Sequence, residues 1–210
     1  MKRIEFDPSL TGPHFFGGWF IEPLSLCDGL ITFFETHQQF QTQGRTQGGK
    51  NLESKKSTDL SIRPRDLEQP DHKPVRDYID ALFYCYEDYL EQWPFLKTIM
   101  PRSEIGSFNI QRYHPGGHFL QTHAERTTIA TSHRVLVWLT YLNDVEGGGS
   151  TYFEHQDLDV QPQKGKTLIW PAEWTHAHYA NVVDSGYKYI ITGWMHFSTE
   201  KAWPGKLIVS

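Results

Sequence analysis

The sequence predicts a mostly β fold, a sandwich or jelly-roll barrel buttressed by N-terminal helices. Apolar residues at helical spacing are confined to roughly the first hundred positions. From Glu104 onward, short β-branched and aromatic runs alternate with Gly, Pro, Asn and Asp. The composition, with 17 Gly and 12 Pro in 210 residues, supplies the turns that many short strands need. Helices followed by strands therefore indicate a β core with helices packed against it.

The N-terminal half is expected to form two amphipathic helices. Residues 1–20 show no period and are predicted to be irregular. Residues 22–40 have apolar positions near helical spacing, with Ser25 as a candidate N-cap. Residues 71–96 form the second predicted helix, which Pro94 ends. Its apolar stripe consists of Val75, Ile79, Leu82, Phe83, Tyr86 and Leu90.

Residues 41–56, "QTQGRTQGGKNLESKK", are polar, rich in Gly and without an apolar period. One interpretation is an ordinary solvated loop. The other is a mobile lid, because long polar loops within compact domains are often functional. The sequence leaves both interpretations open.

Seven or more strands are predicted in the C-terminal half. They correspond to the runs "SFNIQRYHP", "HRVLVWLTYLND", "STYFEH", "LDVQP", "TLIWP", "HAHYANVV" and "YKYIITGWMHF", with "EGGGS" and "PQKGK" as turns. No internal repeat or low-complexity tract interrupts them. We therefore expect a single domain over residues 1–210.

Charge and hydropathy argue against two classes of partner. The net charge is −5 and the pI about 6.1, which disfavours binding to a nucleic-acid backbone. No apolar run is long enough to span a membrane, and the N-terminus lacks the apolar region of a signal peptide. Cys27 and Cys85 stand at no ligand spacing and are expected to be buried, reduced thiols. We therefore expect a cytoplasmic protein that binds neither nucleic acid nor membrane.

A His-x-carboxylate pair is the first indication of a metal site. In a strand, residues i and i+2 point to the same side, so His123 and Glu125 can bind one ion. Together with a distant His they form the facial triad of non-haem Fe(II) oxygenases. The pair His155 and Asp157 has the same spacing, but it lies only 21 residues before His176. That separation leaves too little chain to pass around a barrel, so the first pair is favoured.

The distal ligand is either His176 or His178. The two are two residues apart and face the same side of a strand, so alternation cannot distinguish them. The next segment reads as a hairpin whose loop is residues 184–186, with Gly186 at the position that requires positive φ. In this register Val182 faces Lys188 and His178 faces Thr192. If His178 points inward, the inward set on the next strand is Lys188, Ile190, Thr192 and Trp194, whereas Tyr187, Tyr189 and Ile191 face away.

An inward lysine beside a metal must have an anionic partner or lose its charge. A carboxylate on a bound ligand would supply that partner. The alternative is that the Lys188 side chain extends to the solvent at the barrel rim.

These segments together resemble the 2-oxoglutarate/Fe(II)-dependent oxygenases, and most closely their prolyl 4-hydroxylase-like branch of bacterial and phage type. The resemblance covers residues 105–197 and rests on "YHPGGHFLQTHAE", "VLVWLTYLND", "GGGSTYF", "PQKGKTLIWP" and "THAHYANVVDSGYKYIITGW". It implies a double-stranded β-helix core over residues 105–197, with residues 1–100 as helical support and a possible lid. It also implies Fe(II), 2-oxoglutarate and O2, with ascorbate as a further candidate cofactor.

The resemblance also assigns roles to residues. His123, Glu125 and His178 match the metal ligands, which favours His178 over His176. Lys188 matches the basic residue that binds the distal carboxylate of 2-oxoglutarate. The remaining matches line the cosubstrate pocket and are Tyr113, Tyr141 and Trp194. The family pattern is His-x-Asp, so the glutamate is a departure that bears on the metal geometry.

The resemblance implies hydroxylation of a C–H bond, most specifically of a prolyl residue in a peptide or protein, with succinate and CO2 as co-products. No residue encodes proline recognition directly, so a free amino acid or small metabolite is the first alternative. The second is a cupin-like metal-binding module without oxygenase activity, although such a module has no need for an inward Lys188. A purely structural jelly roll would leave the ligand set unexplained.

Overall fold

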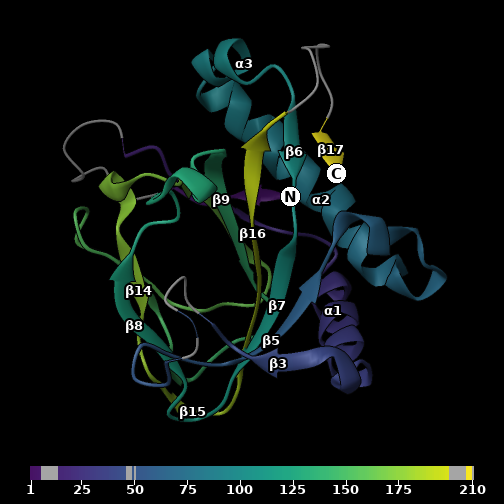
Figure 1. Cartoon of the computed structure of the whole chain (residues 1–210), viewed down its shortest axis with the longest axis vertical. Helices are drawn as coiled ribbons and strands as arrows, with labels where there is room; N and C mark the ends of the chain where they lie inside the picture. Colours follow the sequence, from purple (N-terminus) through teal and green to yellow (C-terminus); the bar gives the residue numbers. More distant parts are fainter. Residues whose placement is uncertain (6–13, 46–48, 50, 199–206, 210) are drawn as a thin grey trace.

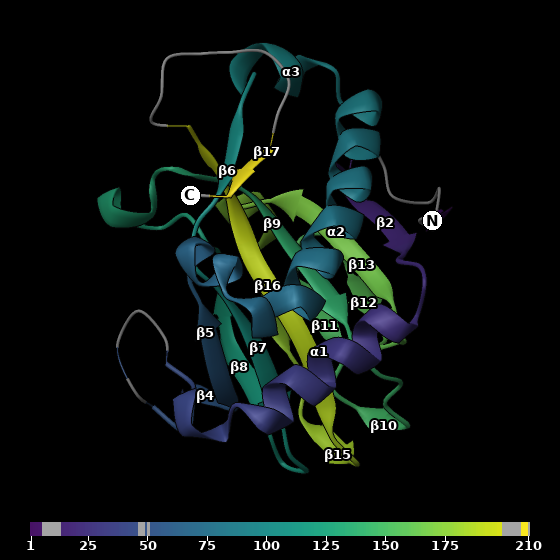
Figure 2. The same ribbon diagram turned by 90° about the vertical axis from the view of Figure 1, so that its right-hand side faces the viewer.

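The computed structural model describes residues 1–5, 14–45, 49, 51–198 and 207–209. These residues form three layers (Figure 1): a helical layer, a large β-sheet and a smaller β-sheet. The two sheets face each other and the helices cover the outer face of the large sheet (Figures 1 and 2). The predicted mostly β fold with supporting helices is confirmed.

The helices are α1 (Ser25–Thr36), α2 (Lys73–Gln92) and α3 (Phe95–Ile99). Five 3-10 turns accompany them: Gln38–Phe40, Pro64–Glu68, Pro70–His72, Ile129–Thr131 and Trp174–His176. The predicted stripe of α2 faces the core, with Val75, Ile79, Leu82 and Tyr86 buried and Phe83 and Leu90 packed at its edge. Ser25 is the first residue of α1 and not its N-cap; Leu24 occupies the cap position without a side-chain hydrogen bond. Helix α1 is therefore held by its packing on α2 and the sheet.

The large sheet contains ten strands in the order β1-β2-β13-β9-β16-β7-β5-β3, with β6 and β17 attached beside β16. Its strands are β1 (Lys2–Arg3), β2 (Gly17–Phe20), β3 (Gln41–Gln43), β5 (Thr58–Ile62), β6 (Ser103–Ile105), β7 (Phe108–Tyr113), β9 (Arg134–Tyr141), β13 (Lys166–Pro171), β16 (Lys188–Phe197) and β17 (Leu207–Val209). Strand β16 pairs with both β7 and β9 and so lies at the centre of the sheet.

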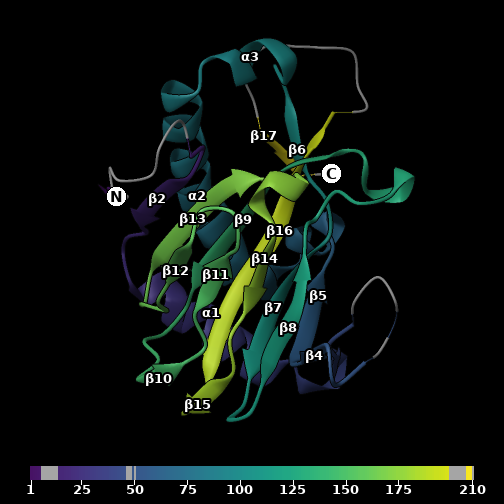
Figure 3. The same cartoon turned by 90° about the vertical axis from the view of Figure 1, so that its left-hand side faces the viewer.

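The small sheet has the order β12-β11-β14-β8-β4 and lies opposite the large one (Figure 3). Its strands are β4 (Lys55–Lys56), β8 (His118–His123), β11 (Thr151–Phe153), β12 (Leu158–Val160) and β14 (His178–Ala180). A separate two-stranded pair is formed by β10 (Gly147–Gly148) and β15 (Val183–Ser185).

The first hundred residues contain more strand than the sequence predicts. Residues 17–20, expected to be irregular, form β2 against β13. The segment 41–56 begins and ends in strands, because β3 pairs with β5 and β4 pairs with β8. These strands are two to four residues long, too short to show an alternating pattern. The centre of the predicted lid, at 46–48 and 50, lies outside the described residues.

The predicted hairpin after His178 is wrong. Strand β14 pairs with β8 and β11 in the small sheet, whereas β16 pairs with β7 and β9 in the large sheet. His178 therefore lies opposite His123 and not opposite Thr192. Gly186 has the expected positive φ of 71°. The chain uses this turn to cross from one sheet to the other.

Two apolar clusters hold the layers together. One lies between the helices and the large sheet and includes Tyr78, Phe108 and Trp138. The other lies between the two sheets and includes Phe153 and Trp170. Both cysteines are buried and unpaired, as predicted, and burial raises the pKa of Cys27 to about 11 and that of Cys85 to about 12. None of the described helices is long and apolar enough to cross a bilayer.

Candidate metal centre and cosubstrate cavity

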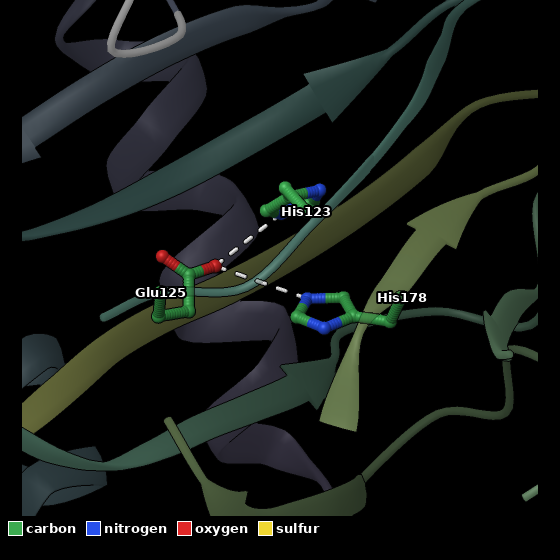
Figure 4. Close-up of side chains that lie close together, drawn as sticks. All are labelled: His123, Glu125 and His178. Atoms are coloured by element: carbon green, nitrogen blue, oxygen red, sulfur yellow. Dashed lines mark ion pairs between the residues drawn. The ribbon is translucent and has the colours of Figure 1, made fainter. Parts of the chain in front are cut away.

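The small sheet brings His123, Glu125 and His178 together. His123 ends β8, His178 begins β14, and the two are directly paired across the strands. Glu125 follows β8 and points back between the two rings (Figure 4). Its Oε1 lies 3.4 Å from His123 Nε2 and 3.8 Å from His178 Nε2. One nitrogen or oxygen from each of the three side chains lies within 4.8 Å of the others, the arrangement of a metal site.

The hydrogen bonds of the two imidazoles fix which nitrogen faces the cluster. His123 Nδ1 lies 2.8 Å from the carbonyl oxygen of Gln121, and His178 Nδ1 lies 2.9 Å from that of His176. A carbonyl oxygen can only accept, so each Nδ1 carries the proton. Each Nε2 then directs a lone pair at Glu125 Oε1. Three electron-pair donors converge without a hydrogen between them, which fits a bound cation.

The protonation states suit a metal ion as well. Burial lowers the pKa of His178 to about 4, so its ring is neutral at pH 7. Burial also opposes the charge of Glu125, but its contacts with His123, His178 and Arg134 outweigh burial and lower its pKa to about 2. Neutral imidazole and ionised carboxylate are the forms that bind metal.

The alternative ligands lie apart from this cluster. His155 and Asp157 are exposed in the turn between β11 and β12. His176 is buried, but its Nε2 lies 2.9 Å from the carbonyl oxygen of His14, and its ring packs on Phe16. Within the described part of the chain, the His123, Glu125 and His178 set is the single group of this kind.

The second oxygen of Glu125 is held by two residues of the large sheet. Trp194 donates from Nε1 to Glu125 Oε2 at 3.0 Å, and Arg134 Nη1 lies 3.4 Å from the same oxygen. The Arg134 guanidinium also lies over the Trp194 ring, 3.6 Å from its centroid. The sequence analysis included Trp194 but not Arg134. Arg134 begins β9, and its proximity to Glu125 depends on how the β8–β9 connection folds back.

The cluster opens into a cavity of about 790 Å³ between the two sheets. Lys188 lines this cavity and is 1% exposed. It donates to the carbonyl oxygen of Gly149 at 2.7 Å, and its Nζ lies 4.5 Å from the Tyr113 ring centroid. Burial lowers its pKa to about 7. No carboxylate in the described residues pairs with it, so this buried amine lacks an anionic partner.

The tyrosines that the resemblance assigns to the cosubstrate pocket differ in position: one lines the cavity and the other lies behind its wall. Tyr113 lines the cavity and donates its hydroxyl hydrogen to Gln111 at 2.7 Å. Tyr141 is fully buried and does not line the cavity. Its hydroxyl donates to Thr151, which does line the cavity. Tyr141 therefore supports the wall from behind. The inward set predicted on β16, from Lys188 to Trp194, does face the cavity.

A buried ion pair that the sequence did not predict also lines the cavity. Lys55 Nζ is 2.8 Å from Asp59 Oδ2, and both side chains are less than 10% exposed. Ser57 and Gln111 also donate to Asp59. The four-residue spacing of Lys55 and Asp59 does not predict a contact, because a segment that runs from a loop into a strand has no period that places the two side chains together. The pair closes the cavity next to Phe119, whose ring stacks on His123 at 3.9 Å.

Residues 108–196 match the model of the 2OG-Fe(II) oxygenase superfamily. This range includes the strands that carry His123, His178 and Lys188. This part of the chain is therefore similar to the 2OG-Fe(II) oxygenase superfamily. It is 29% identical over 134 residues to the probable prolyl 4-hydroxylase 9 of Arabidopsis thaliana, covering 51% of this chain and 46% of that protein. It is 31% identical over 75 residues to the human prolyl 4-hydroxylase subunit alpha-1, covering 32% of this chain and 14% of that subunit. The chain thus spans less than half the length of these relatives.

Solved structures share the fold over nearly the whole chain. A prolyl 4-hydroxylase from Pseudomonas putida has a TM-score of 0.65 at 16% identity, covering 88% of this chain and 94% of that one. The viral collagen prolyl hydroxylase of Paramecium bursaria Chlorella virus-1, solved with 2-oxoglutarate, has a TM-score of 0.64 at 18% identity, covering 90% and 99%. A prolyl hydroxylase from Trichoplax adhaerens, solved with a peptide fragment, has a TM-score of 0.69 at 12% identity, covering 88% and 84%. These matches confirm the double-stranded β-helix.

Proposed function

We propose that the chain is a 2-oxoglutarate- and Fe(II)-dependent dioxygenase that hydroxylates prolyl residues in a peptide or protein. The observation that carries the proposal is one cavity that contains both a three-residue metal cluster and a buried, anion-free Lys188. When bound, Fe(II) with 2-oxoglutarate supplies the chemistry: O2 places one oxygen atom in the substrate C–H bond and the other in succinate, and CO2 is released.

His123, Glu125 and His178 would hold the metal ion through two Nε2 atoms and Oε1. The stacked Phe119 ring and the Nδ1–H bonds to backbone carbonyls keep both imidazoles in the orientation that binding requires. The sheet pairing between His123 and His178 fixes their separation before the ion arrives. The ligands therefore need little reorganisation on binding.

Lys188 would bind the distal carboxylate of 2-oxoglutarate. A charged lysine this deeply buried is costly without an anion, and a dicarboxylate that spans from the metal to Nζ removes this cost. Tyr113 and Ile190 line the cavity next to it, and Trp170 lines it near the metal cluster. The surrounding apolar wall excludes water from the reacting atoms. A cupin-like module without oxygenase activity would leave this lysine unexplained.

The remainder of the cavity suits an extended peptide. Exposed or half-buried polar side chains in its lining include Thr42, Gln43, Arg45, Ser61, Asn109 and Gln121. Amide and hydroxyl groups can hydrogen-bond main-chain N–H and C=O groups without requiring a particular sequence. The relatives are named for prolyl 4-hydroxylation, and one of the similar structures contains a peptide.

The first test is anaerobic. Fe(II) and then 2-oxoglutarate are added, and the visible metal-to-ligand charge-transfer band is recorded. We expect a band in the wild type that weakens in Lys188→Ala and disappears in Glu125→Ala. Metal binding without a band would overturn the oxygenase proposal in favour of a metal-binding module.

The second test is turnover. Proline-rich peptides and free amino acids are incubated with Fe(II), 2-oxoglutarate and air, and both succinate and the gain of one oxygen atom are measured by mass spectrometry. We expect peptide-dependent succinate that Glu125→Ala abolishes. If free amino acids are hydroxylated and peptides are not, the small-molecule alternative replaces the prolyl peptide.

A further inference from the structure

The glutamate at position 125 raises a geometric problem that the neighbouring residues can solve. A glutamate has one methylene more than the aspartate of the usual His-x-Asp pattern, and its carboxylate is correspondingly free to rotate. A carboxylate can bind a metal through one oxygen or through both. If both oxygens bound, the second would occupy a position that a facial triad leaves open.

The structure separates the two oxygens of Glu125. Oε1 faces the two imidazoles, at 3.4 Å and 3.8 Å. Oε2 faces the other way and receives the Trp194 Nε1–H at 3.0 Å and the Arg134 guanidinium at 3.4 Å. These two donors stand on β16 and at the start of β9, in the sheet opposite His123 and His178. Donors on the large sheet thus hold Oε2, while Oε1 faces the imidazoles of the small sheet.

Trp194 and Arg134 also fix each other. The guanidinium lies over the indole, 3.6 Å from the ring centroid, and Arg134 Nη1 additionally donates to the backbone carbonyl of Glu125 at 3.1 Å. The Arg134 side chain is 19% exposed, so these interactions are only weakly screened by water. A preorganised pair of donors holds Oε2 more firmly than either donor alone.

We propose that Trp194 and Arg134 are positioning residues that retain the outer oxygen of Glu125, so that the glutamate offers the metal ion a single oxygen and leaves the neighbouring coordination position free. The inference rests on the proposed function only in taking His123, Glu125 and His178 as metal ligands. Arg134, which is not part of the metal-ligand motif, would thus restrain the Glu125 carboxylate. This restraint would allow the longer glutamate side chain to replace the usual aspartate.

The test counts open coordination positions with Mn(II) as the probe. Water-proton relaxation at saturating protein reports the number of exchangeable waters on the bound ion. In Trp194→Phe and in Arg134→Gln we expect this number to fall by about one relative to the wild type, because Oε2 is released to the metal. We also expect 2-oxoglutarate to bind the Mn(II)-loaded variants about tenfold more weakly. A residue that only stabilised the fold would not remove a metal-bound water.

Arg112→Gln is the matched control. Arg112 also pairs with a glutamate, at 2.7 Å from Glu35, and lies over an aromatic ring, 5.4 Å from the centroid of Phe34, but on the helical side of the large sheet. It should leave the water number unchanged. Circular dichroism and thermal unfolding establish that each variant is folded. Because Trp194→Phe and Arg134→Gln are tested separately, loss of folding in one leaves the other decisive.

A double-mutant cycle isolates the contact. Glu125→Asp withdraws the outer oxygen from both donors, so Trp194→Phe should have no further effect on the water number in that background. An unchanged water number in both single variants would overturn the inference while leaving the metal site intact. Equal Mn(II) affinity in the wild type and Glu125→Ala would instead overturn the metal site itself, so the two failures are distinguishable.

Discussion

At the scale of single residues, the site depends on where protons reside. The carbonyl oxygens of Gln121 and His176 assign the Nδ1 protons of the two histidines and thereby free both Nε2 atoms. Lys188 stands at the other end of the cavity with its pKa lowered to about 7 by burial. Hydrogen bonding thus prepares the proposed metal end of the cavity, and burial prepares the proposed anion end.

The lowered pKa of Lys188 predicts a pH dependence of 2-oxoglutarate binding. The free protein loses the lysine proton above about pH 7, well below the ordinary 10.5. A bound carboxylate favours the protonated form and raises the pKa again, so at pH 8 binding takes up close to one proton. Affinity should fall by up to about tenfold per pH unit above pH 7.

Calorimetry of the Mn(II)-loaded protein in two buffers of different ionisation enthalpy measures this proton uptake. Lys188→Arg is the control, because a guanidinium stays charged throughout this range. Its binding should take up no proton at pH 8. Equal proton uptake in the wild type and Lys188→Arg would contradict the prediction and place the titrating group elsewhere.

The clustering of His123, Glu125 and His178 could be predicted from the sequence, but their supporting contacts could not. His123 and His178 lie on strands, where a period of two fixes the side that a residue faces, and Glu125 follows directly after β8. Arg134 reaches Glu125 only because the β8–β9 connection turns back on itself. The Lys55–Asp59 pair depends on strand β4, which is two residues long and has no recognisable period.

At the scale of elements, β16 shows which part of strand structure a sequence specifies. Its alternation correctly separates the cavity side, with Lys188 and Trp194, from the helical side, with Tyr189 and Ile191. The strand partner was predicted wrongly because the turn at Gly186 suggested a local hairpin. The residue period and the turn residues predict which side chains of a strand face the core. Which strand pairs with it depends on the apolar surfaces that the whole chain buries.

Gly193 on β16 is expected to be indispensable for packing between the large sheet and the helices. A Cβ there would lie 2.5 Å from Trp138 Cζ2 and 2.7 Å from Phe108 Cβ, and both of these residues are fully buried. Gly193→Ala should therefore lower the free energy of unfolding by about 1–3 kcal/mol. Urea unfolding followed by fluorescence measures the change.

Gly29→Ala in α1 is the matched control. Its Cβ would meet only Pro74 Cβ, at an ordinary 3.5 Å, and alanine suits a helix interior better than glycine. This variant should raise the free energy of unfolding by about 0.5–1 kcal/mol. A Gly193→Ala variant as stable as the wild type would show that the sheet shifts to accept the methyl group.

At the scale of the whole molecule, the two sheets contribute different parts of the site. The small sheet carries His123 and His178, and the large sheet carries Lys188, Trp194 and Arg134. Glu125 contacts both groups. A metal ion with 2-oxoglutarate would therefore connect the sheets through the cavity, where the protein itself places an unpaired lysine and three converging electron-pair donors.

This division predicts two separable increments in stability. Mn(II) at a hundred times its Kd should raise the free energy of unfolding by about 2.7 kcal/mol, because the metal binds the folded chain alone. Adding 2-oxoglutarate should raise it further, since the cosubstrate links the metal on the small sheet to Lys188 on the large one. Thermal or chemical unfolding with each addition in turn measures both increments.

Glu125→Ala should lose both increments, whereas Lys188→Ala should keep the metal increment and lose most of the 2-oxoglutarate increment. If Lys188→Ala retained the full second increment, 2-oxoglutarate would be held by the metal end of the cavity alone, and the connection between the sheets would not exist.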